Sequence, residues 1–170
     1  MGANDHREDA AKEAPARCAI LVVTDTKTRE TDTSGRAASE ILTRSGHSVL
    51  SHEIVPNDPA RIRTAAEQAL KQADLVISIG GTGPGRKDIS VGSLRPLFAK
   101  ELPGFGELFR SLSAREIGTA AILSRALLGI TRDGQVLVAL PGSENAVRLA
   151  LEEILMKELK HLLRELRRRA

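Results

Sequence analysis

The fold is decided by the stretch ADLVISIGGTGPGRKDIS, Ala73 to Ser90. Residues 74–79 form a short apolar run rich in β-branched side chains, which is typical of a buried parallel strand. Four glycines follow within residues 80–85, where neither a strand nor an ordinary helix can continue. In open α/β sheets, a glycine-rich turn at the carboxyl end of a buried strand is where ligands bind.

The chemistry of this turn favours a phosphate. Glycines let main-chain N–H groups approach an anion, and a nest of such groups carries a positive potential. Two basic residues and a carboxylate come next, Arg86, Lys87 and Asp88, enough to neutralise a phosphate and hold Mg²⁺. We therefore predict that the phosphate binds at Gly80, Gly81, Thr82 and Gly83.

Two named motifs are excluded at this turn. A P-loop needs Lys-[Ser/Thr] after its last glycine, and the spacing of a dinucleotide fingerprint is not met either. The alternative to a binding loop is a glycine turn that only reverses the chain.

Composition points to one soluble globular domain. The chain has 170 residues, of which 41% are hydrophobic and 28% charged, and no apolar run is long enough for a transmembrane span. The polar N-terminus without a signal-peptide pattern and the single cysteine, Cys18, fit a cytoplasmic protein without disulfides. We interpret residues 1–16 as a disordered arm and residues 17–170 as one domain.

The net charge of +3 is concentrated at the C-terminal end. Residues 157–170 hold six basic and two acidic side chains, so the rest of the chain is slightly acidic. A basic end complements the dipole of a long helix, which explains these charges without nucleic acid. The chain has no Trp or Tyr, so base stacking has little support, and we expect neither nucleic acid nor a membrane as a partner.

Strands and helices alternate along the chain, which predicts a three-layer α/β/α domain with a mostly parallel sheet and a late antiparallel hairpin. Strands are expected at residues 18–24, 49–55, 74–79 and 136–140, with the apolar residues 120–128 before a hairpin turn at Asp133-Gly134. Helices are expected at residues 35–45 with Ser34 as N-cap, 59–72 with Asp58 as N-cap, 91–100 and 107–112, and as one long helix after Ser143.

Four polar or glycine-rich loops follow these strands, at residues 25–34, 56–58, 80–88 and 141–143. The carboxyl ends of parallel strands share one edge of a sheet, so we expect the loops to meet there. Two of the loops lead into helix N-termini, at Ser34-Gly35 and Ser143, which attract anions. No histidine is placed for a Ser/His/Asp triad or a metal cluster, which favours phosphate chemistry with Mg²⁺.

The chain resembles the MoaB/Mog family of molybdenum-cofactor biosynthesis proteins. The resemblance covers residues 18 to about 160 and rests on an ordered set of motifs: Val23-Thr24-Asp25-Thr26, Asp32-Thr33-Ser34-Gly35, Gly80 to Gly83 with Arg86 to Ser90, Pro103 to Glu107, Ile122 to Ala126, and Leu140 to Ser143. Each motif is weak alone, and the ordered set is specific.

The resemblance implies an activity. Active members are molybdopterin adenylyltransferases, which join molybdopterin and ATP with Mg²⁺ to give adenylyl-molybdopterin and pyrophosphate. It implies Asp88 as a catalytic and metal-binding carboxylate, although Asp88 could instead cap the next helix. It also implies ligand contacts from Asp25, Ser34, Gly35, Ser124, Arg125, Pro141, Gly142 and Ser143. Arg125 could contact phosphate or form an ion pair within the chain.

One departure concerns the second carboxylate. The family commonly has an acid directly after the position of Pro56, where this chain has Asn57 and then Asp58. We expect Asp58 to supply what remains of that function, and we expect Asn57→Asp to raise activity. The alternatives are a catalytically silent molybdopterin carrier or scaffold, and an unrelated phosphate-binding domain. The resemblance also implies a homo-oligomer, either a trimer or a hexamer.

Overall fold

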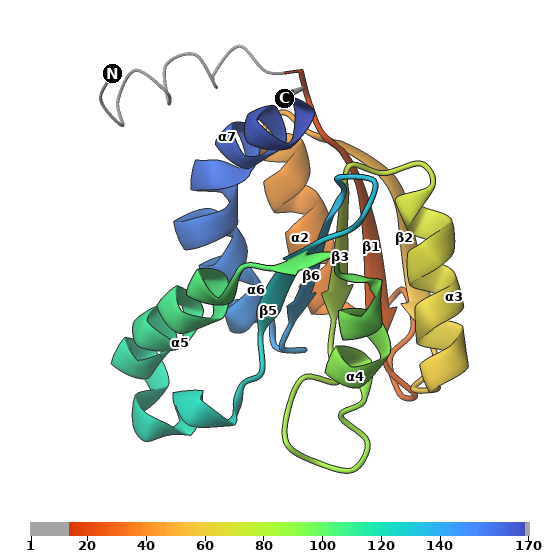
Figure 1. Ribbon diagram of the computed structural model, residues 1–170. Helices are drawn as coiled ribbons and strands as arrows, with labels where there is room; N and C mark the ends of the chain where they lie inside the picture. Colours follow the sequence, from red (N-terminus) through yellow and green to blue (C-terminus); the bar gives the residue numbers. More distant parts are fainter. Residues whose placement is uncertain (1–13, 169–170) are drawn as a thin grey trace.

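The computed structural model describes residues 14–168 and forms one six-stranded sheet between two layers of helices (Figure 1). The strand order is β2-β1-β3-β6-β5-β4. The first four strands are parallel, and β5 and β4 are antiparallel additions at one edge. The strands are β1 Arg17–Val23, β2 Ser48–Val55, β3 Leu75–Ile79, β4 Lys100–Glu101, β5 Leu127–Ile130 and β6 Val136–Leu140. The predicted fold class is confirmed.

The helices divide between the two faces of the sheet. They are α2 Thr33–Arg44, α3 Pro59–Leu70, α4 Ser90–Leu94, α5 Pro103–Ile117, α6 Glu144–Ala150 and α7 Met156–Arg167. One core packs α2, α5, α6 and α7 against alternate residues of the central strands, such as Ile20, Ile77 and Val138. The other core packs α3 and α4 against residues of opposite parity, such as Leu21, Val76 and Leu137. This alternation is why the strands read as continuous apolar runs.

Several predicted elements differ from the structure because of prolines. The helix expected at 91–100 is only α4 followed by a 3-10 turn, Arg95–Leu97. Pro96 has no N–H to continue the α-helical ladder. The helix expected at 107–112 is α5, which begins earlier, at Pro103, because proline occupies a first-turn position, where a missing N–H costs nothing.

The remaining differences concern boundaries. Residues 118–123 form a 3-10 helix, so the apolar run at 120–128 contributes only the start of β5, which does form the predicted hairpin with β6. The long C-terminal helix contains a π-helical turn, Leu151–Leu155. Ala16 is fully buried and not part of an exposed arm, whereas residues 1–13 of that arm lie outside the described residues.

Candidate functional site

The four loops predicted to meet do lie together at the carboxyl edge of the parallel strands. The Asn57 main-chain N–H donates to Asp25 Oδ1 at 2.8 Å, which joins the loops after β1 and β2. The Gly80 N–H donates to the Leu140 oxygen at 2.8 Å, which joins β3 to the end of β6. In Figure 1 the glycine-rich loop hangs below α4, at the opposite end of the sheet from the described ends of the chain.

The first two glycines of the loop are required by backbone geometry. Gly80 and Gly81 have φ values of +105° and +67°, in the region that side chains disfavour. A Cβ on Gly80 would lie 2.5 Å from the Val23 carbonyl oxygen, and one on Gly81 would collide with the Ser90 hydroxyl. The loop can therefore pass this close to β1 and α4 only with glycines.

The Asp88 carboxylate folds back under the glycine loop. Its Oδ2 accepts from the Gly85 N–H at 2.9 Å, and a Cβ on Gly83 would lie 2.7 Å from the same oxygen. The N-cap of α4 is Ile89, which makes no side-chain cap bond. The alternative role of Asp88 as a helix cap is therefore wrong, and its carboxylate belongs to the loop.

Arg125 fastens the glycine loop from the other side. Its Nε donates to the oxygens of Gly83 at 3.0 Å and Thr82 at 3.2 Å, and its Nη2 donates to the Asp88 oxygen at 2.5 Å. Within residues 14–168 it forms no ion pair, so the ion-pair alternative is wrong. Because all three acceptors are neutral carbonyls, the charge of Arg125 is still available to an anion on the loop.

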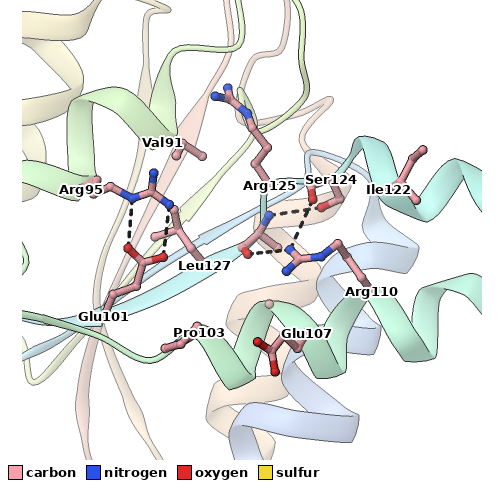
Figure 2. Close-up of a pocket in the computed structure, with 12 residues that line it drawn as sticks. Val91, Arg95, Glu101, Pro103, Glu107, Arg110, Ile122, Ser124, Arg125 and Leu127 are labelled. Carbon is pink, nitrogen blue, oxygen red and sulfur yellow. Dashed lines mark hydrogen bonds and ion pairs between the residues drawn. The ribbon is translucent and has the colours of Figure 1, made fainter.

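Two cavities flank Arg125. One of about 650 Å³ lies between α3 and α4 and has Asp88 and Arg63 in its wall. The other, of about 330 Å³, is bounded by α4, α5 and the start of β5 (Figure 2). In the second cavity Arg95 pairs with Glu101 at 3.0 Å, and Arg110 donates to the Ser124 and Ala126 oxygens at 3.4 Å. Figure 2 shows Arg125 extending away from Arg110, so its cation serves the loop rather than this second cavity.

The start of α2 differs from the prediction. Its N-cap is Asp32, whose Oδ1 accepts from the Gly35 N–H at 2.9 Å and from the Ser34 hydroxyl at 3.0 Å. Ser34 is therefore not the cap. The buried carboxylate already occupies the first turn of α2, so this helix end is no open anion site.

A histidine that sequence reasoning set aside completes this cluster. His52 Nε2 lies 2.8 Å from Asp32 Oδ2, because β2 places the ring beside α2. Burial acts to raise the pKa of Asp32, but the bonds from Gly35, His52 and Ser34 outweigh it and hold that pKa below its ordinary value. Asp32 is the central member and Ser34 is fully buried, so the arrangement is not a Ser/His/Asp nucleophile.

Lys27 is a further site residue that sequence reasoning missed. Its ammonium donates to Ser34 Oγ and to the Gly142 oxygen, each at 3.2 Å, and so ties the loop after β1 to the Pro141–Ser143 turn. It has no carboxylate within ion-pair distance among the described residues. The signal in the sequence is a basic residue between Asp25 and Asp32, on a loop predicted to lie at the ligand-binding edge of the sheet.

The remaining predicted residues serve structure as well. Ser143 caps α6 by accepting from the Ala146 N–H at 3.3 Å, and Asp58 caps α3 by accepting from the Arg61 N–H at 2.8 Å. Both caps are confirmed. Gly35 is buried against Asp32 and His52, where any Cβ would collide with both side chains. Ser124 Oγ accepts from the Ala126 N–H at 3.3 Å.

The carboxylates of the site fit a Mg²⁺ ion that enters together with a nucleotide, whose phosphates supply most of its ligands. Among residues 14–168, no group of three or more His, Cys, Asp or Glu could hold a metal. Mg²⁺ on a nucleotide needs only one or two protein carboxylates beside phosphates and water. Asp88 suits that role, since its Oδ1 accepts no hydrogen bond from the described residues.

The geometry defines an α/β domain that presents a glycine loop, two cations and a carboxylate at one sheet edge. No helix within the described part of the chain has the length and apolarity to cross a membrane. The family described as "Probable molybdopterin binding domain" matches residues 19–161. The chain belongs to this family of molybdenum cofactor biosynthesis proteins.

Relatives agree in sequence and in structure. Molybdenum cofactor biosynthesis protein B of Halalkalibacterium halodurans is 43% identical over 169 residues, 98% of each chain. That of Bacillus subtilis is 39% identical over 171 residues, 99% of each chain. A crystal structure of a molybdenum cofactor biosynthesis protein B has a TM-score of 0.88 at 41% identity, covering 92% of this chain and 98% of that one. The tungsten cofactor synthesizing protein MoaB from Pyrococcus furiosus has a TM-score of 0.84 at 36% identity, covering 92% and 99%.

Proposed function

We propose that this protein acts in molybdenum cofactor biosynthesis by adenylylating molybdopterin with Mg-ATP. The observation that carries the proposal is the glycine loop, which Asp88 and Arg125 hold at the ligand edge beside an open cavity. Main-chain N–H groups and cations at such an edge bind phosphates. Both substrates of the proposed reaction carry phosphate, and the family binds molybdopterin.

In the proposed reaction, an oxygen of the terminal phosphate of molybdopterin attacks the α-phosphorus of ATP. The bond from that phosphorus to the bridging oxygen breaks, and pyrophosphate leaves with the electron pair. The protein aligns the two phosphates and neutralises their charge, which is how phosphoryl transfer is catalysed in general. Mg²⁺, when bound, stabilises the charge on the phosphate oxygens, and Asp88 would hold it.

Each part of the site has a role in this proposal. The loop N–H groups of residues 80–83 bind phosphate, and Arg125 fixes the loop and adds positive charge. Lys27, on the loop after β1, offers a second cation beside Ser34 and Gly142. Asp58 remains our candidate for the second carboxylate, although one of its oxygens serves the cap of α3.

The proposal is tested by incubating the protein with molybdopterin and Mg-ATP and assaying adenylyl-molybdopterin and pyrophosphate. Product formation that depends on Asp88 supports it. Asn57, in place of the usual acid, favours a second candidate function, a molybdopterin carrier or scaffold without turnover. Saturable binding of molybdopterin without any product would establish that alternative.

A further inference from the structure

Asn57 contacts two other loops of the ligand edge at once. Its main-chain N–H donates to Asp25 Oδ1 at 2.8 Å, after β1. Its side-chain Nδ2 donates to the main-chain oxygen of Lys87 at 2.6 Å, in the glycine-rich loop. Lys87 directly precedes Asp88, so this amide holds the chain next to the carboxylate of the site.

The orientation of the Asn57 amide is fixed by its surroundings. The Oδ1 atom is buried and accepts no hydrogen bond within the described residues. Turning the amide over would place that oxygen 2.6 Å from the Lys87 oxygen, and two acceptors at this distance repel each other. The side chain must therefore face Lys87 with its donor.

Residues 87 and 88 are consequently held from two sides. Asn57 binds the Lys87 oxygen from the β2 side, and Arg125 binds the Asp88 oxygen at 2.5 Å from the β5 side. The segment between Gly83 and Asp88 has exposed side chains at Pro84, Arg86 and Lys87, so packing contributes little to its conformation. The loop has local bonds of its own, such as those from Ile89 N–H to the Lys87 oxygen at 3.1 Å and from Asp88 N–H to the Gly85 oxygen at 3.0 Å, and the bonds from Asn57 and Arg125 are the ones that tie residues 87 and 88 to the neighbouring strands.

We propose that Asn57 is a positioning residue that keeps the 83–88 loop in its ligand-binding form, and that a carboxylate at position 57 releases the loop. An ionised carboxylate has only acceptors, so it cannot bond the Lys87 oxygen. The sequence alone predicts that Asn57→Asp raises activity. The hydrogen bonds of Asn57 predict the opposite effect, a loss of order in the 83–88 loop.

Limited trypsin digestion tests the proposal without ligand. Arg86 and Lys87 are exposed cleavage sites inside the loop, and Arg132, in the β5–β6 turn, is an exposed reference site far from it. We expect Asn57→Asp and Asn57→Ala to raise the cleavage rate at 86–87 by about fivefold to tenfold relative to that at Arg132, as loss of one hydrogen bond predicts. An unchanged ratio, or equal acceleration at both sites, would overturn the proposal.

A double variant separates the lost donor from the added charge. If repulsion between the new carboxylate and Asp25 were the cause, Asp25→Asn combined with Asn57→Asp would restore the cleavage ratio of the unaltered chain. That result would overturn the proposal. We expect no restoration, because Asp25→Asn returns no donor to the Lys87 oxygen.

A ligand readout distinguishes positioning from a general structural role, and it rests on the proposed function because it uses ATP. The Kd of Mg-ATP for Asn57→Asp and for Asn57→Ala should exceed that of the unaltered chain about fivefold to tenfold at pH 7.5, as loss of one hydrogen bond predicts, while the melting temperatures change by less than a few degrees. A Kd unchanged in both variants, or a weaker Kd that accompanies a large fall in melting temperature, would contradict the proposal. If the unaltered chain binds no ATP, the proposed function fails and the trypsin ratio alone decides.

Discussion

The guanidinium of Arg125 donates to the main-chain oxygen of Asp88, the residue whose carboxylate lies under the same loop. One side chain just before β5 thus binds a residue 37 places earlier in the chain. Arg125 is itself exposed, so its bonds restrain the loop more than they stabilise the core.

The Arg125 contacts predict a variant that separates loop order from stability. Arg125→Lys keeps the charge but cannot span three carbonyls, because the ammonium is a compact point charge and not a planar fork. We expect Mg-ATP affinity to fall about tenfold while the melting temperature changes by less than a few degrees, as for an exposed site. Isothermal titration and thermal melts measure the two effects. Arg95→Lys, at an exposed ion pair in the neighbouring cavity, is the matched control and should preserve affinity.

Asp88→Asn should abolish adenylyl transfer and leave the fold intact. The amide oxygen can still accept from the Gly85 N–H, so the loop keeps this contact. What is lost is the charge that holds Mg²⁺ against phosphate. Product assays and thermal melts on the same preparation check both statements. Unchanged turnover at an unchanged melting temperature would remove Asp88 from the catalytic residues.

Asp58 combines a confirmed cap with a proposed metal role, and two substitutions separate them. Asp58→Asn keeps a good cap, so stability should hold while activity falls at limiting Mg²⁺. Asp58→Ala should in addition lose about 1 kcal/mol of stability. Turnover measured across a Mg²⁺ series, with chemical denaturation in parallel, tests this. If Asp58→Asn is silent at every Mg²⁺ concentration, the second carboxylate lies elsewhere, with Asp25 as the next candidate.

The sequence predicts the sheet well because its signals are local. Each central strand is an apolar run bounded by polar residues or glycine, and the caps at Asp58 and Ser143 were recognised from one or two neighbouring residues. The meeting of the loops followed from strand direction alone. Such features need no knowledge of distant partners.

Contacts between residues far apart in the sequence could not be predicted in the same way. Asp32 rather than Ser34 caps α2, and its second carboxylate oxygen contacts His52 from β2. The bond from Lys27 to Gly142 joins residues 115 places apart. The segment at residues 91–128 differs from the prediction because Pro96 ends a helix and Pro103 begins one, and a short apolar run does not show whether a proline will end or begin a helix.

Stability should depend on pH through His47, which lies at the opposite edge from the ligand loops. The side chain is buried and its Nδ1 accepts from the Ala16 N–H at 3.0 Å. Burial, and then the charge of Lys160, lower the pKa of His47 below its ordinary value. A histidine held neutral in the folded state contributes stability that is present above its unfolded pKa of about 6.5 and is lost as the pH falls.

The corresponding test compares melting temperatures between pH 7.5 and pH 5.5. The unaltered chain should lose stability over this range, and His47→Asn, whose side chain does not titrate, should lose less. His161→Asn is the matched control, because it removes a histidine at a half-buried position on α7, away from His47. Equal slopes for all three chains would show that another group controls the dependence.

The last prediction concerns self-association, which the resemblance implies and one surface supports. Large apolar side chains are exposed along α5 and the 3-10 helix after it, with Ile122 at 77%, Ile117 at 56% and Leu123 at 54%. Phe105 and Phe109, earlier on α5, are instead buried and contribute no exposed surface. Three large exposed apolar side chains within residues 117–123 make this segment a candidate interaction surface. We expect light scattering at micromolar concentration to give the mass of a trimer or a hexamer.

Ile122→Glu should shift that mass towards the monomer, because burying an unpaired carboxylate at an interface is costly. Leu50→Glu provides the control, since Leu50 is also exposed, at 48%, but lies on β2 at the opposite edge of the sheet. Dissociation by both variants, or by Leu50→Glu alone, would place the interface elsewhere. A monomer mass for the unaltered chain would contradict the prediction outright, and the apolar surface beside α5 would then need a different partner.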